Sequence, residues 1–155
     1  MAIVACCNVY NMGRVVVHLH GRAKNASFRA SISEYANRLS SSGVSLVEHR
    51  NKIDPKTYLK EISDKYPGNS IILLQENGEE LDSMQYSEHL KRWSMQRKDT
   101  HLVVGPPGGF ALIGMEYESL SLGKITLPHE LAAVVLLEQL YRASTIIKGL
   151  PYHRP

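Results

Sequence analysis

A glycine- and proline-rich segment, Gly105-Pro106-Pro107-Gly108-Gly109, is the first feature of the sequence that suits ligand chemistry. It directly follows a predicted strand, and ligands of open parallel sheets bind at the carboxyl ends of the strands. Glycines allow a ligand to approach the backbone closely, and prolines fix the shape of a loop. The pattern is neither GxGxxG nor a Walker loop, so it does not indicate a dinucleotide or a nucleoside triphosphate. Taken alone, such a segment is more often just a turn.

Two further segments are expected at the same edge of the sheet. Leu74 to Gly78 ends a strand predicted near the sheet centre, and Leu122 to His129 is bent by glycine and proline. Three loops that converge on one crevice predict a small-molecule site built mostly from backbone groups. The alternative is a set of sheet-edge loops without a ligand.

The C-terminal residues offer a different chemistry. Tyr152, His153 and Arg154 provide a stacking ring, a titratable group and a phosphate donor, a set that suits an RNA nucleotide. On composition alone a frayed tail is the more frequent outcome. His129 is a candidate base or a helix-capping residue, and Arg142, four residues after Glu138, is a functional residue or half of an ordinary helix-face pair.

The other histidines and the cysteines give no sign of a metal site. His18, His49, His89 and His101 are scattered without metal-ligand spacing, and Cys6 and Cys7 are adjacent with no second pair to complete a zinc site or a disulfide framework. This cysteine usage favours a reducing compartment, and no apolar run reaches the length of a membrane span. We therefore expect a cytoplasmic protein that needs no metal and does not enter a membrane.

Length and composition predict one globular domain. The chain has 155 residues, of which 43% are hydrophobic and 21% charged, with a net charge of +3. The basic excess is confined to residues 1–65, which carry 10 basic and 5 acidic side chains, against 8 and 10 in residues 66–155. A positive face favours a phosphate backbone, although a mixed solvated surface gives the same count. The first convincing strand follows residue 13, so we expect an extension over 1–13 and a single domain over 14–155.

The order of predicted elements is typical of an α/β fold. Strands are expected at 14–20, 44–47, 70–75 and 101–105, separated by helices that begin near Ser27, Asp54 and Asp82, with a turn at Asn77-Gly78. This alternation predicts a mainly parallel sheet with helices on both faces. The last third departs from it, with a strand near 120–127 interrupted at 123–124 and a helix over 130–148. That helix is apolar on more than one stripe, which indicates either a second subunit or deep burial within one chain.

Three segments together resemble the RlmH family. They are ITLPH at 125–129, EQLYRA at 138–143 and PYHR at 151–154, and the likeness extends from about Arg14 to the C-terminus. The resemblance implies a SPOUT-class methyltransferase that uses S-adenosylmethionine to methylate N3 of a pseudouridine in 23S ribosomal RNA within the ribosome. It also implies a homodimer and a C-terminal trefoil knot that holds the cofactor.

The resemblance further implies roles for individual residues. Cofactor contacts fall on Leu74, Gly78, Gly105, Gly109, Gly123, Lys124, Ile125, Thr126, Leu127 and Pro128. His129 or His153 is the expected proton relay, Arg142 and Arg154 the expected partners of negative charge, and Tyr152 the expected stacking ring. The chain departs from the family pattern at Gln75, Pro106 and Ala133. These departures leave two alternatives open, which are a SPOUT enzyme for another RNA position and an inactive ribosome-associated RNA-binding protein.

Overall fold

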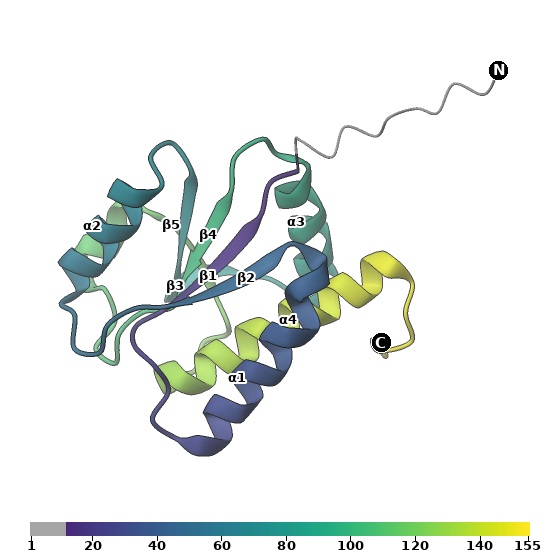
Figure 1. Cartoon of the computed structure of the whole chain (residues 1–155), viewed down its shortest axis with the longest axis horizontal. Helices are drawn as coiled ribbons and strands as arrows, with labels where there is room; N and C mark the ends of the chain where they lie inside the picture. The colour runs from purple at the N-terminus through teal and green to yellow at the C-terminus, as the bar shows by residue number, and fades with distance from the viewer. Residues whose placement is uncertain (1–11) are drawn as a thin grey trace.

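The structure is a computed structural model that describes residues 12–155, and the expected extension therefore lies almost entirely outside the described residues. Figure 1 shows one twisted sheet flanked by helices. The elements in chain order are β1 (Val15–Leu19), α1 (Ala26–Leu39), η2 (Ser40–Ser42), β2 (Val44–Glu48), α2 (Pro55–Lys65), β3 (Ser70–Glu80), α3 (Ser83–Met95), β4 (Thr100–Val103), η3 (Ala111–Glu116), β5 (Glu118–Ser121) and α4 (His129–Lys148).

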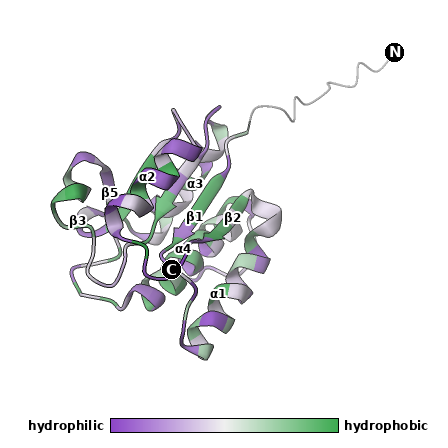
Figure 2. Ribbon diagram, turned by 60° about the vertical axis from the view of Figure 1, so that its left-hand side comes forward, coloured by the Kyte–Doolittle hydropathy of each residue, from purple (hydrophilic) through white to green (hydrophobic). Residues whose placement is uncertain are grey.

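The sheet has five strands in the order β2-β1-β4-β3-β5, and every neighbouring pair is parallel. All the strands therefore end at the same edge. The side chains of β3 and β4 alternate between two cores: Ile72 and Leu102 face α1, α3 and α4, whereas Leu73 and Val103 face α2. The predicted α/β class, with a parallel sheet and helices on both faces, is confirmed. In Figure 2 the central strands are coloured as hydrophobic, while the flanking helices carry hydrophilic positions on their outer sides.

Short polar signals set the helix starts. The Asp54 carboxylate accepts a hydrogen bond from the backbone of Thr57, with Pro55 in the first turn. Asp82 and Gln85 form the capping box predicted from their spacing. These caps satisfy backbone donors that the helices leave unpaired, so the helix boundaries follow from local residues.

Two sequence predictions in this region are wrong. The Asn77-Gly78 pair does not form a turn, because β3 continues to Glu80 and pairs with β5 on both sides of a register shift between Leu74 and Glu79. The strand expected near 120–127 ends at Ser121, and the glycine and proline that follow leave residues 122–128 irregular.

Helix α4 buries most of its apolar surface inside its own chain. Ala133, Leu136, Leu140 and Ala143 belong to the main core and are each at most 2% exposed. In Figure 1, α4 runs beside α1 beneath the sheet. Burial within one chain thus accounts for much of its unusual hydropathy.

Across residues 12–155, none of the helices combines the length and hydropathy that a bilayer span requires.

Candidate active site

A pocket of about 510 Å³ opens at the edge where the strands end. Its wall comes from the end of β3, from the loop between β4 and η3, and from the irregular segment that leads into α4. The lining residues are Leu74, Gln75, Glu76, Asn77, Val104, Gly105, Pro106, Pro107, Gly108, Gly109, Phe110, Ala111, Leu122, Gly123, Ile125, Thr126, Leu127, His129 and Ala132. The three segments expected to converge on one crevice do so.

The glycine loop owes its shape to a tight turn and to the absence of side chains. The amide of Gly109 donates to the carbonyl of Pro106 at 2.9 Å, and Gly109 has φ +70°, a conformation that strains other residues. Gly123 has φ +127°, and the Ser121 hydroxyl bonds both its amide and its carbonyl. A Cβ at Gly109 or Gly123 would meet no atom within 4 Å, so both backbones border open space. The wall is therefore rich in accessible backbone groups.

The pocket combines apolar side chains with few charges. Leu74, Leu122 and Leu127 supply apolar surface, and among the lining residues that the structure describes Glu76 is the one carboxylate. Burial lowers the pKa of His129 from its usual value, and Glu130 opposes that shift. His129 is therefore neutral near pH 7 and has a free lone pair to accept a proton.

Most of the expected cofactor residues line this pocket, and three do not. Leu74, Gly105, Gly109, Gly123, Ile125, Thr126 and Leu127 belong to its wall. Gly78 lies between strands, where a Cβ would stand 2.6 Å from the backbone of Leu120, so its lack of a side chain permits the β3–β5 approach. Lys124 is exposed, and Pro128 is the N-cap of α4.

Several lining residues were missed by the sequence reasoning. Val104, Phe110 and Ala132 lie beside the predicted segments but carry no motif of their own. The only available signal was their position next to strand ends, because apolar wall residues and core residues look alike in a sequence.

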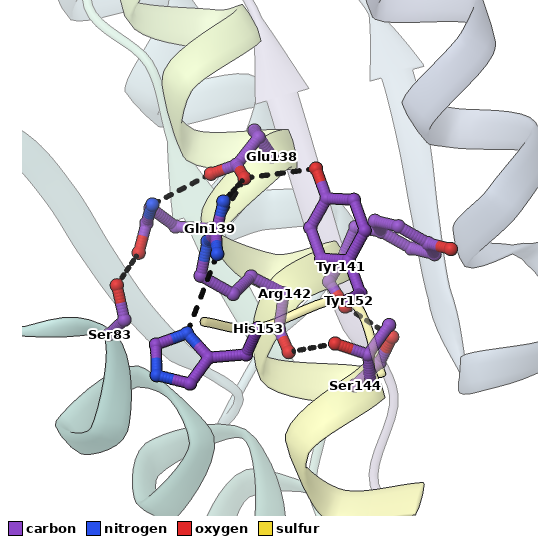
Figure 3. Close-up of polar contacts among 9 residues, drawn as sticks. Ser83, Glu138, Gln139, Tyr141, Arg142, Ser144, Tyr152 and His153 are labelled. Atoms are coloured by element: carbon purple, nitrogen blue, oxygen red, sulfur yellow. Dashed lines mark hydrogen bonds and ion pairs between the residues drawn. The ribbon is translucent and has the colours of Figure 1, made fainter. Parts of the chain in front are cut away.

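A second polar group, which we name the C-terminal cluster, consists of Glu138 and Arg142 from the middle turns of α4 and of Tyr152 and His153 from the tail (Figure 3). One Glu138 oxygen accepts from Arg142 Nε at 3.0 Å, from Arg142 Nη2 at 2.5 Å and from the Tyr152 hydroxyl at 3.1 Å. Arg142 Nη1 donates to His153 Nδ1 at 3.4 Å, and the guanidinium lies 4.9 Å from the centre of the Tyr152 ring. The tail is therefore docked on α4 as far as His153.

These contacts fix the chemistry of the cluster. The hydrogen bonds that Arg142 donates to Glu138 raise the Arg142 pKa, so the guanidinium is a permanent cation. Burial, together with the neighbouring Tyr35 and Glu138, raises the Tyr152 pKa, so the phenol stays protonated. Because an arginine can only donate, His153 Nδ1 is the acceptor of this bond. Arg154 is exposed beyond the cluster.

Hydrogen bonds connect the C-terminal cluster to α3. Gln139 donates from Nε2 to the second oxygen of Glu138 at 2.7 Å and accepts from the Ser83 hydroxyl at 2.7 Å. Figure 3 shows this line of contacts running from Ser83 to Glu138. The Glu138 carboxylate is thus held from both oxygens, and its orientation does not depend on the tail alone.

One subunit does not bring its two groups of predicted catalytic residues together. Thirteen positions of α4 separate His129 from Arg142, which at 1.5 Å per residue is about 20 Å along the helix axis. His129 begins α4 and lines the pocket, whereas Glu138 and Arg142 of the C-terminal cluster lie about 14 and 20 Å further along the helix axis. A site that uses both groups needs the tail of another molecule.

The three departures from the family pattern have structural explanations in this chain. Gln75 donates to the Gly114 carbonyl at 3.1 Å and so fastens η3 to β3. Pro106 is buried and provides the carbonyl of the glycine-loop turn. Ala133 is 2% exposed in the main core, where an arginine would have no space.

Within residues 12–155, no three histidine, cysteine or acidic side chains are placed to hold a metal ion.

A parallel α/β sheet with a glycine-lined pocket at its carboxyl edge defines a cofactor-binding enzyme class. The family described as "Predicted SPOUT methyltransferase" matches residues 14–153. "Ribosomal RNA large subunit methyltransferase H" of Anaeromyxobacter sp. (strain Fw109-5) is 34% identical over 145 residues, which is 86% of this chain and 95% of that protein. The chain therefore belongs to the SPOUT methyltransferase family, in the group of these large subunit methyltransferase H proteins.

A second relative and one solved structure extend the comparison. The protein of the same name from Maridesulfovibrio salexigens is 47% identical over 90 residues, which is 56% of this chain and 58% of the relative. The crystal structure of TrmJ from Z. mobilis ZM4 superimposes with a TM-score of 0.49 at 8% identity, covering 92% of this chain and 71% of that one.

Proposed function

We propose that this protein transfers a methyl group from S-adenosylmethionine to N3 of a pseudouridine in 23S ribosomal RNA. The observation that carries the proposal is the backbone-lined pocket at the sheet edge, in a chain that matches the methyltransferase family over residues 14–153. The name of its relatives supports ribosomal RNA as the substrate.

The pocket fits S-adenosylmethionine in size and chemistry. Its volume of about 510 Å³ lies in the range of pockets that hold a cofactor-sized ligand. Leucines of the wall suit the adenine ring, and the absence of side chains at Gly109 and Gly123 lets its polar edges approach the backbone. Glu76 places one negative charge beside a ligand whose sulfonium and amino groups are positive.

The protein's own residues act on the proton and on the RNA. S-adenosylmethionine supplies an electrophilic methyl group, and the imide N3 attacks only after losing its proton. His129, neutral and at the pocket wall, is one acceptor for that proton. In the C-terminal cluster, the permanent charge of Arg142 suits the developing imide anion, and Tyr152 offers a ring face for the base.

The proposal includes a homodimer in which the tail of one subunit completes the pocket of the other. Its support is the separation of about 20 Å between His129 and Arg142 along α4, which one chain alone does not bridge. A single domain over residues 14–155, a C-terminal trefoil knot around the pocket and a cytoplasmic location beside the ribosome belong to the same proposal.

Nucleoside mass spectrometry tests the proposed reaction. Ribosomes from cells that lack the gene are incubated with the purified protein and S-adenosylmethionine. The expected product is N3-methylpseudouridine at one large-subunit position, with release of S-adenosylhomocysteine. Methylation at another nucleotide would identify a SPOUT enzyme of different specificity, and ribosome binding without cofactor affinity would identify an RNA-binding protein without catalysis.

A further inference from the structure

Three histidines from separate segments form a hydrogen-bonded row on the α2 side of the sheet. His18 in β1 places its Nδ1 2.9 Å from His49 Nε2 and its Nε2 2.8 Å from His101 Nδ1 in β4. His18 and His101 are fully buried, and His49 is 13% exposed. We name His101, His18 and His49 the histidine chain. Because His18 turns its two nitrogens toward different neighbours, the chain is a relay of hydrogen bonds and not a metal cage.

The two ends of the histidine chain give it one direction. At one end the Asn69 amide nitrogen donates to His101 Nε2 at 3.1 Å, so the proton of His101 lies on Nδ1. His101 then donates to His18, and His18 donates to His49. At the other end His49 Nδ1 carries a proton 4.0 Å from the Glu61 carboxylate. In the neutral state each ring has one donor and one acceptor, and both nitrogens of His18 and His101 are hydrogen-bonded.

Protonation breaks this arrangement. A charged histidine has two N–H groups, so an added proton on His18 would point a donor at another donor. The His18 pKa is lowered to about 3, mainly by burial and to a smaller extent by the nearby His101, His49 and Lys65. Burial also lowers the pKa of His49 and of His101. The charged and titratable groups that face the chain are Glu61 and Lys65 from α2, Asp99 before β4 and His20 just after β1.

Tyr58 connects the histidine chain to the pocket. The Tyr58 ring lies edge-on to His49, with 4.8 Å between ring centres, and edge-on to His20 at 5.2 Å. Its hydroxyl donates to the Val104 carbonyl at 3.1 Å, and its ring stacks on Phe110 with centres 6.2 Å apart. Val104 and Phe110 both line the pocket, and Tyr58 is fully buried behind them.

Phe110 in turn supports the glycine loop. A Cβ at Gly105 would stand only 3.1 Å from the Phe110 ring, so the ring packs directly against that part of the loop. The histidine chain, Tyr58 and the pocket wall are therefore one continuous set of contacts. A shift of His49 reaches the Val104 carbonyl through a single side chain.

We propose that the histidine chain and Tyr58 position the Val104–Phe110 wall for the methyl donor, so that donor affinity falls in mild acid when the chain takes up a proton. The inference rests on the proposed function, because it takes this pocket as the S-adenosylmethionine site. His49 and Tyr58 are positioning residues, since they act on the donor through Val104 and Phe110.

The first experiment measures S-adenosylmethionine affinity by calorimetry between pH 7.5 and 5.5, with circular dichroism to show that the protein stays folded. The parent is expected to bind measurably more weakly at pH 5.5, by less than about tenfold because each pKa of the chain lies below 6.5. Glu61→Gln removes the anion that raises the His49 pKa, so the acid loss should move down by about half a pH unit. Glu88→Gln, an exposed change on α3, is the matched control. His129 and the ligand titrate in the same way in the parent and in both variants, so their contribution cancels when the three pH profiles are compared.

The second experiment compares two buried tyrosines at pH 7.5. Tyr58→Phe keeps the ring but removes the hydroxyl that holds Val104, and about fivefold weaker binding is expected. Tyr86→Phe removes a buried hydroxyl on the opposite face of the sheet, for which residues 12–155 offer no hydrogen-bond partner, and its affinity should equal that of the parent. The Tyr58→Phe protein should also show a shallower pH profile.

The outcomes separate this inference from the proposed function. A parent protein that fails to bind S-adenosylmethionine at pH 7.5 would overturn the function itself. A parent that binds, with the same pH profile in Glu61→Gln and full affinity in Tyr58→Phe, would overturn the positioning role alone. Glu61 is 42% exposed, so its variant is expected to fold and the pH comparison stays decisive.

Discussion

Replacing Glu138 with glutamine should release the C-terminal tail while leaving the fold intact. The carboxylate accepts from Arg142 twice, from the Tyr152 hydroxyl and from Gln139. Glutamine keeps one acceptor oxygen, but it loses the negative charge and turns an NH2 group toward other donors. The docked position of Tyr152 and His153 therefore loses its anchor, and methyl transfer should fall.

The size of this effect follows from burial. The Arg142 and Glu138 side chains are only 24% and 19% exposed, so their hydrogen bonds are charge-assisted and poorly screened. Of the bonds to Glu138, the one from the Tyr152 hydroxyl joins the tail to the helix, and the loss of its charge assistance weakens tail docking by about 1 kcal/mol. That free energy corresponds to about a fivefold smaller docked population.

The assay is single-turnover methylation of ribosomes with saturating S-adenosylmethionine. Glu34→Gln is the matched control, because Glu34 also pairs with an arginine four residues later on a helix, but at 59% exposure beside an Arg38 that is 42% exposed. Exposed pairs contribute about 0.5 kcal/mol or less, so the control should keep its rate. Equal rates for the two variants, with both proteins folded, would refute the role of the cluster.

Three further predictions concern the pocket and the core. Gly109→Ala and Gly43→Ala place a methyl group at φ +70° and +73° in open space, so both should lose about 1 kcal/mol of stability, but only the pocket variant should lose affinity for S-adenosylmethionine by calorimetry. The pKa of His18 in the folded protein lies below the unfolded value of 6.5, so the unfolded state binds more protons in acid. His18 alone should therefore lower the free energy of unfolding by about 1.4 kcal/mol between pH 7.5 and 5.5, as measured by urea titration. Unchanged urea midpoints would contradict this account. Ala133→Arg buries an unpaired charge and should cost several kcal/mol in thermal unfolding, unlike Ala30→Arg on the exposed face of α1.

The sequence predicted the α/β class because its signals are local. The capping box at Asp82 and the strand–helix alternation depend on neighbours within a few residues, and the structure confirms both. Asn77-Gly78 misled the prediction because the pair usually marks a turn. Here Gly78 instead allows β3 to approach the backbone of Leu120, a residue far away in the sequence.

The histidine chain had no sequence signal at all. His18, His49 and His101 meet only because β1 lies between β2 and β4 and the strands share a register. Strand order is a long-range property that residue spacing does not encode. The C-terminal tail was ambiguous for a related reason, because its partners on α4 precede it by about three helical turns, and composition cannot tell a docked tail from a frayed one.

The length of α4 between His129 and Arg142 has a genetic consequence under the proposed dimer. A variant that damages the pocket and a variant that damages the tail are each inactive alone, yet they should complement each other when coexpressed. Half of randomly paired dimers are mixed, and each mixed dimer holds one intact site and one doubly damaged site, so about a quarter of all sites should recover. Two alleles with lesions at opposite ends of one helix would thus restore a methylated ribosome, whereas two alleles with lesions at the same end would not.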